Sequence, residues 1–152
     1  MRRPHTMLTW LAVLVLGLLW NTPAAAQEKA EGSEPERVRV QHLLIGFKGS
    51  VGRNYIERNK KQAEALAKQL LERATSEEDF AALVKEHTDD SYPGIYKLVN
   101  KKVKPLAGEL RRFDMAASFG NVSFSLQVGE VGMAEYHPTK SPFGWHIIKR
   151  IK

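Results

Sequence analysis

The clearest pattern in the chain is an alternation of apolar and polar residues over residues 37–47 (RVRVQHLLIGF). Alternation with a period of two is typical of a half-buried β-strand. We therefore expect one side of this strand to face the core. The positions on that side are Val38, Val40, His42 and Leu44, so the strand carries an imidazole into an apolar environment.

Two helices are predicted next, because apolar residues then recur three and four positions apart. Ser76, followed by three acidic residues, is the predicted N-cap of the second helix, which should end near Thr88. The apolar stripe of the first helix comprises Ala63, Leu66, Ala67, Leu70, Leu71 and Ala74. The buried side of the second comprises Phe80, Leu83, Val84 and His87.

A turn with two aspartates follows the second helix. Asp89 and Asp90 lie in HTDDSYPG, where aspartate is common for its turn chemistry, and a catalytic role is the alternative. Residues 95–99 are apolar and predict a short strand. Residues 100–111 show no clear period and predict a basic loop.

The last third of the chain completes the predicted fold. Residues 113–119 predict a short helix with Gly120 as its stop. Residues 130–137 and 145–152 predict two strands joined by a turn. The order of elements predicts an α+β domain, a small four-stranded antiparallel sheet with surrounding helices.

The N-terminal segment has the pattern of a secretory signal. Residues 1–26 combine a basic start, a short apolar run and a small-residue exit. The run is shorter than the roughly 20 residues of a spanning helix, which favours cleavage after Ala26 over a retained anchor, the one case in which we expect membrane attachment. Residues 27–36 predict a flexible acidic linker, and residues 37–152 the domain. We expect an exported protein, periplasmic or secreted.

Net charge changes once this signal is set aside. The 152 residues contain 23 Lys plus Arg against 17 Asp plus Glu, a formal charge of +6. Removing residues 1–26 leaves 21 basic and 17 acidic residues and a charge of +4. These cations are scattered without interleaved aromatic residues, which favours a solvated surface over nucleic-acid binding. The absence of cysteine excludes disulfides, thiolate metal sites and a cysteine nucleophile.

Two histidines within apolar strands are the first candidates for chemistry. A buried imidazole needs partners for both nitrogens, and neighbouring strands would let His42 and His146 bond to each other. They are either core residues that set strand register or catalytic residues. The histidines lack metal-ligand spacing such as HExxH, so we expect no metal and no cofactor. Met115 and Phe119, four residues apart, fit either plain core or a binding pocket.

Four segments, in order, resemble motifs of the parvulin-type peptidyl-prolyl isomerases: VQHLLI, EEDFAALVKEHTDD, MAASFGNVSFSLQVGEVG and SPFGWHIIKR. The resemblance covers residues 37–152 and implies a parvulin-like fold of the FKBP-like superfold. It assigns His42 and His146 to the paired histidines beneath the active site. Asp90 falls where parvulins carry either Cys or Asp. The resemblance therefore implies that these three residues form the catalytic group.

The same resemblance implies an apolar substrate pocket. Met115 and Phe119 match the residues that receive the substrate proline ring. Phe143 falls where some members carry serine, so it is expected to contact substrate without a hydroxyl role. The helix that bears Met115 and Phe119 is expected to continue to about Phe124, in contrast to a stop at Gly120.

One family motif has two possible placements here. Parvulins often carry Gly-Asp-Leu-Gly and an aromatic residue before the Met/Phe helix. The sequence GEL ending at Leu110 is the better fit, which makes Leu110 the third wall of the pocket and residues 92–107 an enlarged loop. The alternative fit to residues 94–98 places Tyr96 or Leu98 there.

The implied function is cis-trans isomerisation of X-Pro bonds in exported, unfolded or newly translocated polypeptides, without a cofactor. Two alternatives from other classes remain. One is a non-catalytic peptide-binding or chaperone module, and the other is a basic nucleic-acid binder, which the scattered cations disfavour. The oligomeric state stays open.

Overall fold

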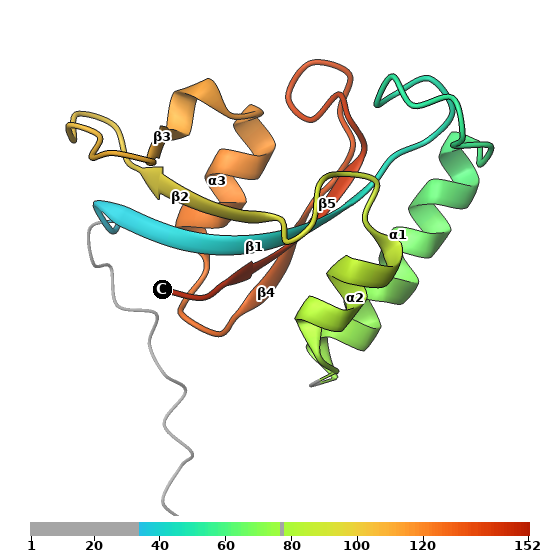
Figure 1. The fold of residues 1–152 in the computed structure, drawn as a ribbon, viewed down its shortest axis with the longest axis horizontal. Coiled ribbons are helices and arrows are strands. Elements are labelled where there is room, and N and C mark those ends of the chain that lie inside the picture. The colour runs from blue at the N-terminus through green and yellow to red at the C-terminus, as the bar shows by residue number, and fades with distance from the viewer. Residues whose placement is uncertain (1–33, 77) are drawn as a thin grey trace, which may run out of the picture. The chain divides into compact units, whose positions relative to one another are not determined.

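The computed structural model describes residues 34–76 and 78–152. The predicted signal and most of the predicted linker lie outside these residues. None of the helices in the described part has the length and apolar character of a membrane-crossing segment. Along the chain (Figure 1) the elements are β1 (Arg37–Ile45), α1 (Lys60–Thr75), α2 (Phe80–His87), β2 (Ile95–Val99), β3 (Leu110–Arg111), the 3-10 helix η1 (Arg112–Asp114), α3 (Ala117–Ser125), β4 (Val131–Ala134) and β5 (Trp145–Arg150).

One sheet holds all five strands, in the order β3-β2-β1-β5-β4. β1 pairs antiparallel with β2 and β5, and β4 pairs antiparallel with β5. These are the four strands that the apolar patterns predict. The fifth, β3, runs parallel to β2 and pairs through Leu110 and Arg111 alone. The predicted α+β class is confirmed. The predicted number of strands is one too few, because the two residues of β3 cannot display an alternation.

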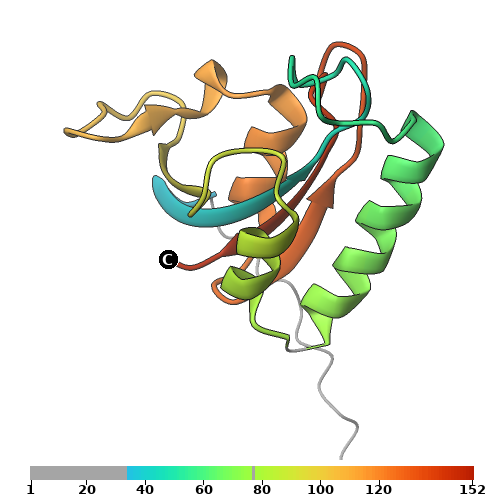
Figure 2. The same cartoon turned by 45° about the vertical axis from the view of Figure 1, so that its right-hand side comes forward.

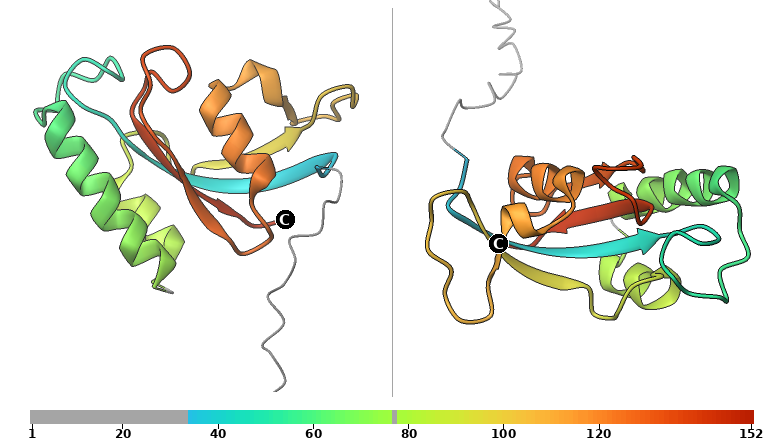
Figure 3. Two further views of the ribbon diagram at one scale, coloured as in Figure 1. Left: turned by 180° about the vertical axis from the view of Figure 1, so that it is seen from behind. Right: turned by 90° about the horizontal axis from the view of Figure 1, so that it is seen from above.

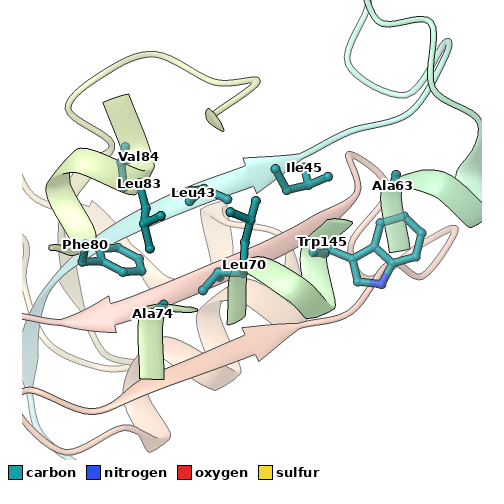
Figure 4. Close-up of a cluster of buried hydrophobic side chains, with 11 residues drawn as sticks. Leu43, Ile45, Ala63, Leu70, Ala74, Phe80, Leu83, Val84 and Trp145 are labelled. Carbon is teal, nitrogen blue, oxygen red and sulfur yellow. The ribbon is translucent and has the colours of Figure 1, made fainter. Parts of the chain in front are cut away.

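The two faces of the sheet bury separate apolar clusters. On one face, α1 and α2 pack over Leu43 and Ile45 of β1 and over the facing residues of β5 (Figure 4). On the other face, α3 packs against Val38 and Val40, and from behind it lies across the strands (Figure 3). β1 is therefore buried on both sides along most of its length, where the alternation predicted only one. His42 shares its side with the valines and faces α3.

The helix caps differ from the predicted ones at one point. Ser76 is the C-cap of α1, and its backbone N–H donates to the carbonyls of the last turn. Asp79 is the N-cap of α2, where its carboxylate accepts from the backbone N–H of Ala81. The predicted N-cap at Ser76 is therefore wrong. Both residues have side-chain oxygens that can cap a helix, and Asp79 is the one that directly precedes the first residue of α2, Phe80.

Gly120 lies inside α3 and does not end it. A Cβ at this position would lie 3.1 Å from both the Cγ and the carbonyl oxygen of Arg112. Both contacts are tighter than ordinary van der Waals contacts, so glycine favours the close approach of η1 to the helix. The extension to about Phe124 implied by the family resemblance is confirmed, and the stop predicted at Gly120 is wrong.

Candidate active site

Pairing between β1 and β5 brings the two predicted histidines into contact. The register sets Leu44 opposite His146 and His42 opposite Ile148, so the histidines are diagonal neighbours on one face. Their Nδ1 atoms lie 3.3 Å apart, and their rings are nearly parallel at 16°. Their exposed fractions are only 3% and 5%. The expectation that neighbouring strands let the two rings bond is confirmed.

Asp90 joins this pair from the turn after α2. Its Oδ2 accepts from Nε2 of His42 at 3.0 Å and from the hydroxyl of Tyr96 on β2, also at 3.0 Å. The hydrogen bond from His42 holds the pKa of Asp90 well below its usual range. Burial, together with the charge of Asp90, raises the pKa of Tyr96 to about 12. Asp90 is therefore an ionised acceptor and Tyr96 a protonated donor at neutral pH.

The hydrogen bond to Asp90 fixes one hydrogen of His42. Because Asp90 accepts, Nε2 of His42 carries a hydrogen. One hydrogen lies between the two Nδ1 atoms; His146 supplies it when His42 is neutral, and His42 supplies it when His42 is protonated. Nε2 of His146 is buried and has no hydrogen-bond partner within the described residues. The network thus connects His146 through His42 to Asp90.

This arrangement opposes protonation of His146. Burial lowers the pKa of His146 to about 3; a positive charge on His42 acts in the same direction, and the carboxylate of Asp90 opposes the shift. A proton on Nε2 would place a charge in the core with no acceptor for it. The histidine pair is therefore suited to holding geometry rather than to exchanging protons near neutral pH.

Stability should consequently fall in mild acid through His146. Its pKa is lowered from 6.5 to about 3 on folding, so the unfolded chain binds the additional proton in this window. We expect this residue to remove about 1.4 kcal/mol of unfolding free energy per pH unit as the pH falls from about 6 to about 4. Urea unfolding at several pH values measures the slope. In His146→Asn, whose amide keeps a donor near Nδ1, the slope should be shallower by about one proton; an unchanged slope would assign the acid sensitivity elsewhere.

An apolar cavity of about 220 Å³ opens above the network. Met115 and Ala116, just before α3, form one wall, and the ring of Phe119 lies edge-on to both histidines with centroids 5.2 and 5.3 Å away. Phe143 stands at the mouth and is 48% exposed. The residues that line the cavity are His42, Leu44, Val51, Asp90, Tyr96, Met115, Ala116, Phe119, Phe143 and His146.

The third wall of the cavity is Tyr96, and Leu110 lies outside it. Leu110 belongs to the exposed edge strand β3, where its exposed fraction is 43%. The placement of the family motif on residues 108–110 therefore does not hold, and the alternative placement on residues 94–98 matches the geometry. The enlarged loop accordingly joins β2 to β3 and does not precede β2.

The loop between β1 and α1 supplies a rim that the sequence did not indicate. Val51 lines the cavity from this loop, and the hydroxyl of Ser50 donates to the carbonyl of Phe143 at 2.9 Å. The loop and the β4–β5 connection stand side by side in Figures 1 and 2. Leu44 also lines the cavity, and its shared side with His42 on β1 was a signal that could have found it.

The other aspartate of the turn, Asp89, is held in a partly buried ion pair. Nη2 of Arg58 donates to its two carboxylate oxygens at 2.7 and 2.5 Å, and Nε of Arg58 donates to the carbonyl of Gly46 at 3.0 Å. The backbone N–H of Gly46 donates to Asp89 at 2.7 Å. The Arg58–Asp89 clamp therefore ties the end of β1 and the segment before α1 to the turn that carries Asp90.

Metal chemistry has no donor set in the described residues. No group of three or more His, Asp or Glu side chains there gathers closely enough to hold an ion. Both nitrogens of His42 are already engaged, by His146 and by Asp90. The polar side chains at the cavity therefore hydrogen-bond to one another and form part of the cavity wall.

Residues 42–152 match the family described as rotamase, PPIC-type PPIASE domain. The chain belongs to this family of peptidyl-prolyl isomerase domains, the parvulins. The match begins at His42 and includes every residue that lines the cavity. The predicted family is therefore confirmed.

The chain is also similar to curated relatives and to a solved structure. The chain is 33% identical over 128 residues to Chaperone SurA from Chromohalobacter salexigens, covering 80% of this chain and 25% of that protein. It is 38% identical over 116 residues to Foldase protein PrsA 4 from Bacillus cereus, covering 74% and 31%. The chain thus spans only a quarter to a third of these relatives. The structure of peptidyl-prolyl isomerase ESS1 from Candida albicans aligns with a TM-score of 0.58 and 25% identity, covering 79% of this chain and 65% of that one.

Proposed function

We propose that this chain catalyses cis-trans isomerisation of X-Pro bonds in polypeptides, with the proline ring held in the cavity above the two histidines. The observation that carries the proposal is the combination of an apolar cavity with an ionised carboxylate at its wall. At about 220 Å³ the cavity is smaller than the roughly 300–1,000 Å³ pockets that hold drug-sized ligands, and it suits a single ring.

The reaction needs only a lower rotational barrier. Rotation about the peptide bond faces about 18–20 kcal/mol because the nitrogen lone pair is delocalised into the carbonyl. The cis and trans forms of an X-Pro bond differ little in energy, so no bond breaks and no cofactor is needed. Met115 and Phe119 would fix the ring while the preceding carbonyl turns.

Asp90 would contribute through its charge. Delocalisation places negative charge on the carbonyl oxygen of the planar amide, and twisting the bond removes it. A carboxylate near that oxygen disfavours the planar form more than the twisted one, which lowers the barrier. Each tenfold in rate requires roughly 1.4 kcal/mol. The histidines and Tyr96 hold Asp90 in place and need not transfer protons.

NMR exchange spectroscopy on an uncharged X-Pro peptide tests the proposal, since it reports binding and isomerisation together. We expect Met115→Ala to lower kcat/KM about tenfold or more, because the ring loses part of its apolar wall. Met115→Leu, which nearly conserves side-chain volume, should stay within about threefold. Peptide binding without isomerisation by the wild-type protein would contradict the proposal and favour a non-catalytic peptide-binding module.

We further propose that the substrates are unfolded or newly translocated polypeptides outside the cytoplasm. The support is the secretory pattern of residues 1–26. N-terminal sequencing of the exported protein tests it, with Gln27 as the expected first residue.

A further inference from the structure

We infer that the face of the sheet opposite the cavity carries a second binding surface, which takes acidic segments of polypeptides. The first observation is a hollow of about 320 Å³ at the start of β1. It is lined by Arg37, Val38, Arg39, Lys97, Glu109 and Lys152, none of which belongs to α1, α2 or α3. We call this hollow the basic groove.

The strand cations of the basic groove, Arg39 and Lys97, lie on the face opposite the cavity because of strand alternation. Arg37 and Arg39 alternate along β1 with Val38 and Val40, which face α3 and share their side with His42. Lys97 pairs with Arg39 across β1 and β2 and faces the same way as it does. A ligand in the groove therefore leaves the cavity free.

The opposed cations of the two strands are the second observation. Arg39 and Lys97 are directly opposite in the register, where like charges destabilise a sheet. The acidic side chain in the groove, Glu109, is engaged by Arg37 at 3.1 Å. Within the described residues, no Asp or Glu side chain forms a salt bridge with Arg39, Lys97 or Lys152. A bound anion would relieve this repulsion.

The main chain brings the third cation close. The backbone N–H of Arg39 donates to the carbonyl of Lys152 at 2.9 Å, and the start of β1 and the C-terminal end lie near each other in Figure 1. Lys152 thus joins the two strand cations at one site. The groove combines basic side chains from β1, from β2 and from the segment after β5.

The shape of the groove favours a polypeptide over other anions. Its lining has no aromatic side chain on which nucleic-acid bases could stack. The lining also has no exposed large apolar side chain that could enter a bilayer. The concave shape of the groove does not match a flat membrane surface. The guanidinium of Arg39 matches the geometry of a carboxylate. Side chains two apart on β1 repeat about every 6.6 Å, the spacing of alternate carboxylates on an extended chain.

The test uses a short fluorescent peptide of Asp, Glu, Gly and Ser, which lacks proline and therefore reports the groove independently of the proposed isomerase function. At low salt we expect the wild-type protein to bind it in preference to the matched Asn and Gln peptide. The double variant Arg39→Gln, Lys97→Gln should bind about tenfold more weakly. A control with the same charge change, Lys61→Gln with Lys85→Gln on α1 and α2, should stay within about twofold.

The same samples provide the outcomes that would overturn the proposal. Equal weakening in both double variants would mean that net charge alone binds the peptide. Binding of phosphatidylglycerol vesicles that depends on Arg39 and Lys97, without binding of the acidic peptide, would replace the polypeptide by a membrane surface. Isomerisation of an uncharged X-Pro peptide should be unchanged in Arg39→Gln, Lys97→Gln, which also shows that the variant is folded.

Discussion

Replacing Asp90 with alanine is expected to lower kcat/KM for X-Pro isomerisation about 100-fold or more, which corresponds to roughly 2.7 kcal/mol of the barrier. Two effects combine. The cavity loses its negative charge, and the donors of His42 and Tyr96 lose the acceptor that they share. Each donor left buried without a partner costs about 1–3 kcal/mol, so the cavity wall should also loosen.

Two milder variants separate these effects. Asp90→Asn removes the charge and keeps one acceptor oxygen, so we expect an intermediate loss of about tenfold. Tyr96→Phe removes one donor and keeps both the charge and the bond from His42, so we expect a change of only a few fold. The rates are measured on an uncharged X-Pro peptide, beside thermal unfolding. If Asp90→Ala retained most of the activity while Met115→Ala lost it, the pocket alone would account for the catalysis.

The histidine pair shows how much of the site local periodicity can predict. Alternation placed His42 on the side of Val38 and Val40, and it placed His146 within a second strand. When these two strands pair, their register places the two histidines diagonally across from each other, and the rings come into contact. Periodicity said nothing of Asp90, whose contact with His42 spans 48 positions of sequence and depends on how the turn folds back.

The third wall of the cavity shows where sequence comparison fails. GEL at residues 108–110 is the closer match to the family motif, yet Tyr96 occupies the wall. Residues 95–97 pair with β1, and this pairing carries Tyr96 to within 3.0 Å of Asp90. Strand pairing and burial place Tyr96 at the cavity wall. The long loop after β2 leaves the GEL segment, which resembles the family motif, at the exposed edge of the sheet.

Close packing and ion pairs between residues distant in sequence are difficult to predict from local sequence patterns. Glycine is a residue type that often ends a helix, but Gly120 lies inside α3, where Arg112 approaches it closely. Arg58 lies in a segment without apolar periodicity, so nothing local indicates that its guanidinium pairs with Asp89. Its partner, Asp89, was equally consistent with ordinary turn chemistry.

Removing one half of the Arg58–Asp89 clamp is expected to be the most destabilising of the changes considered. In Asp89→Ala, the guanidinium of Arg58 keeps its place beside the carbonyl of Gly46 but loses its carboxylate, and the N–H of Gly46 loses its acceptor. Breaking a buried pair by removing one partner costs about 3–5 kcal/mol. Because Arg58 is a quarter exposed, we expect the lower end, about 3 kcal/mol, in urea unfolding.

A double-mutant cycle tests whether the clamp acts as a unit. If it does, Arg58→Met combined with Asp89→Ala should cost clearly less than the sum of the two single changes, because neither charge is then left unpaired. Additive costs would show that the two residues act separately. The clamp also anchors the turn next to Asp90, so in Asp89→Ala we expect KM for the X-Pro peptide to rise and the pair of Asp90 with His42 to loosen. Rescue of KM in the double variant would show that an uncompensated charge, rather than the missing carboxylate itself, displaces the turn.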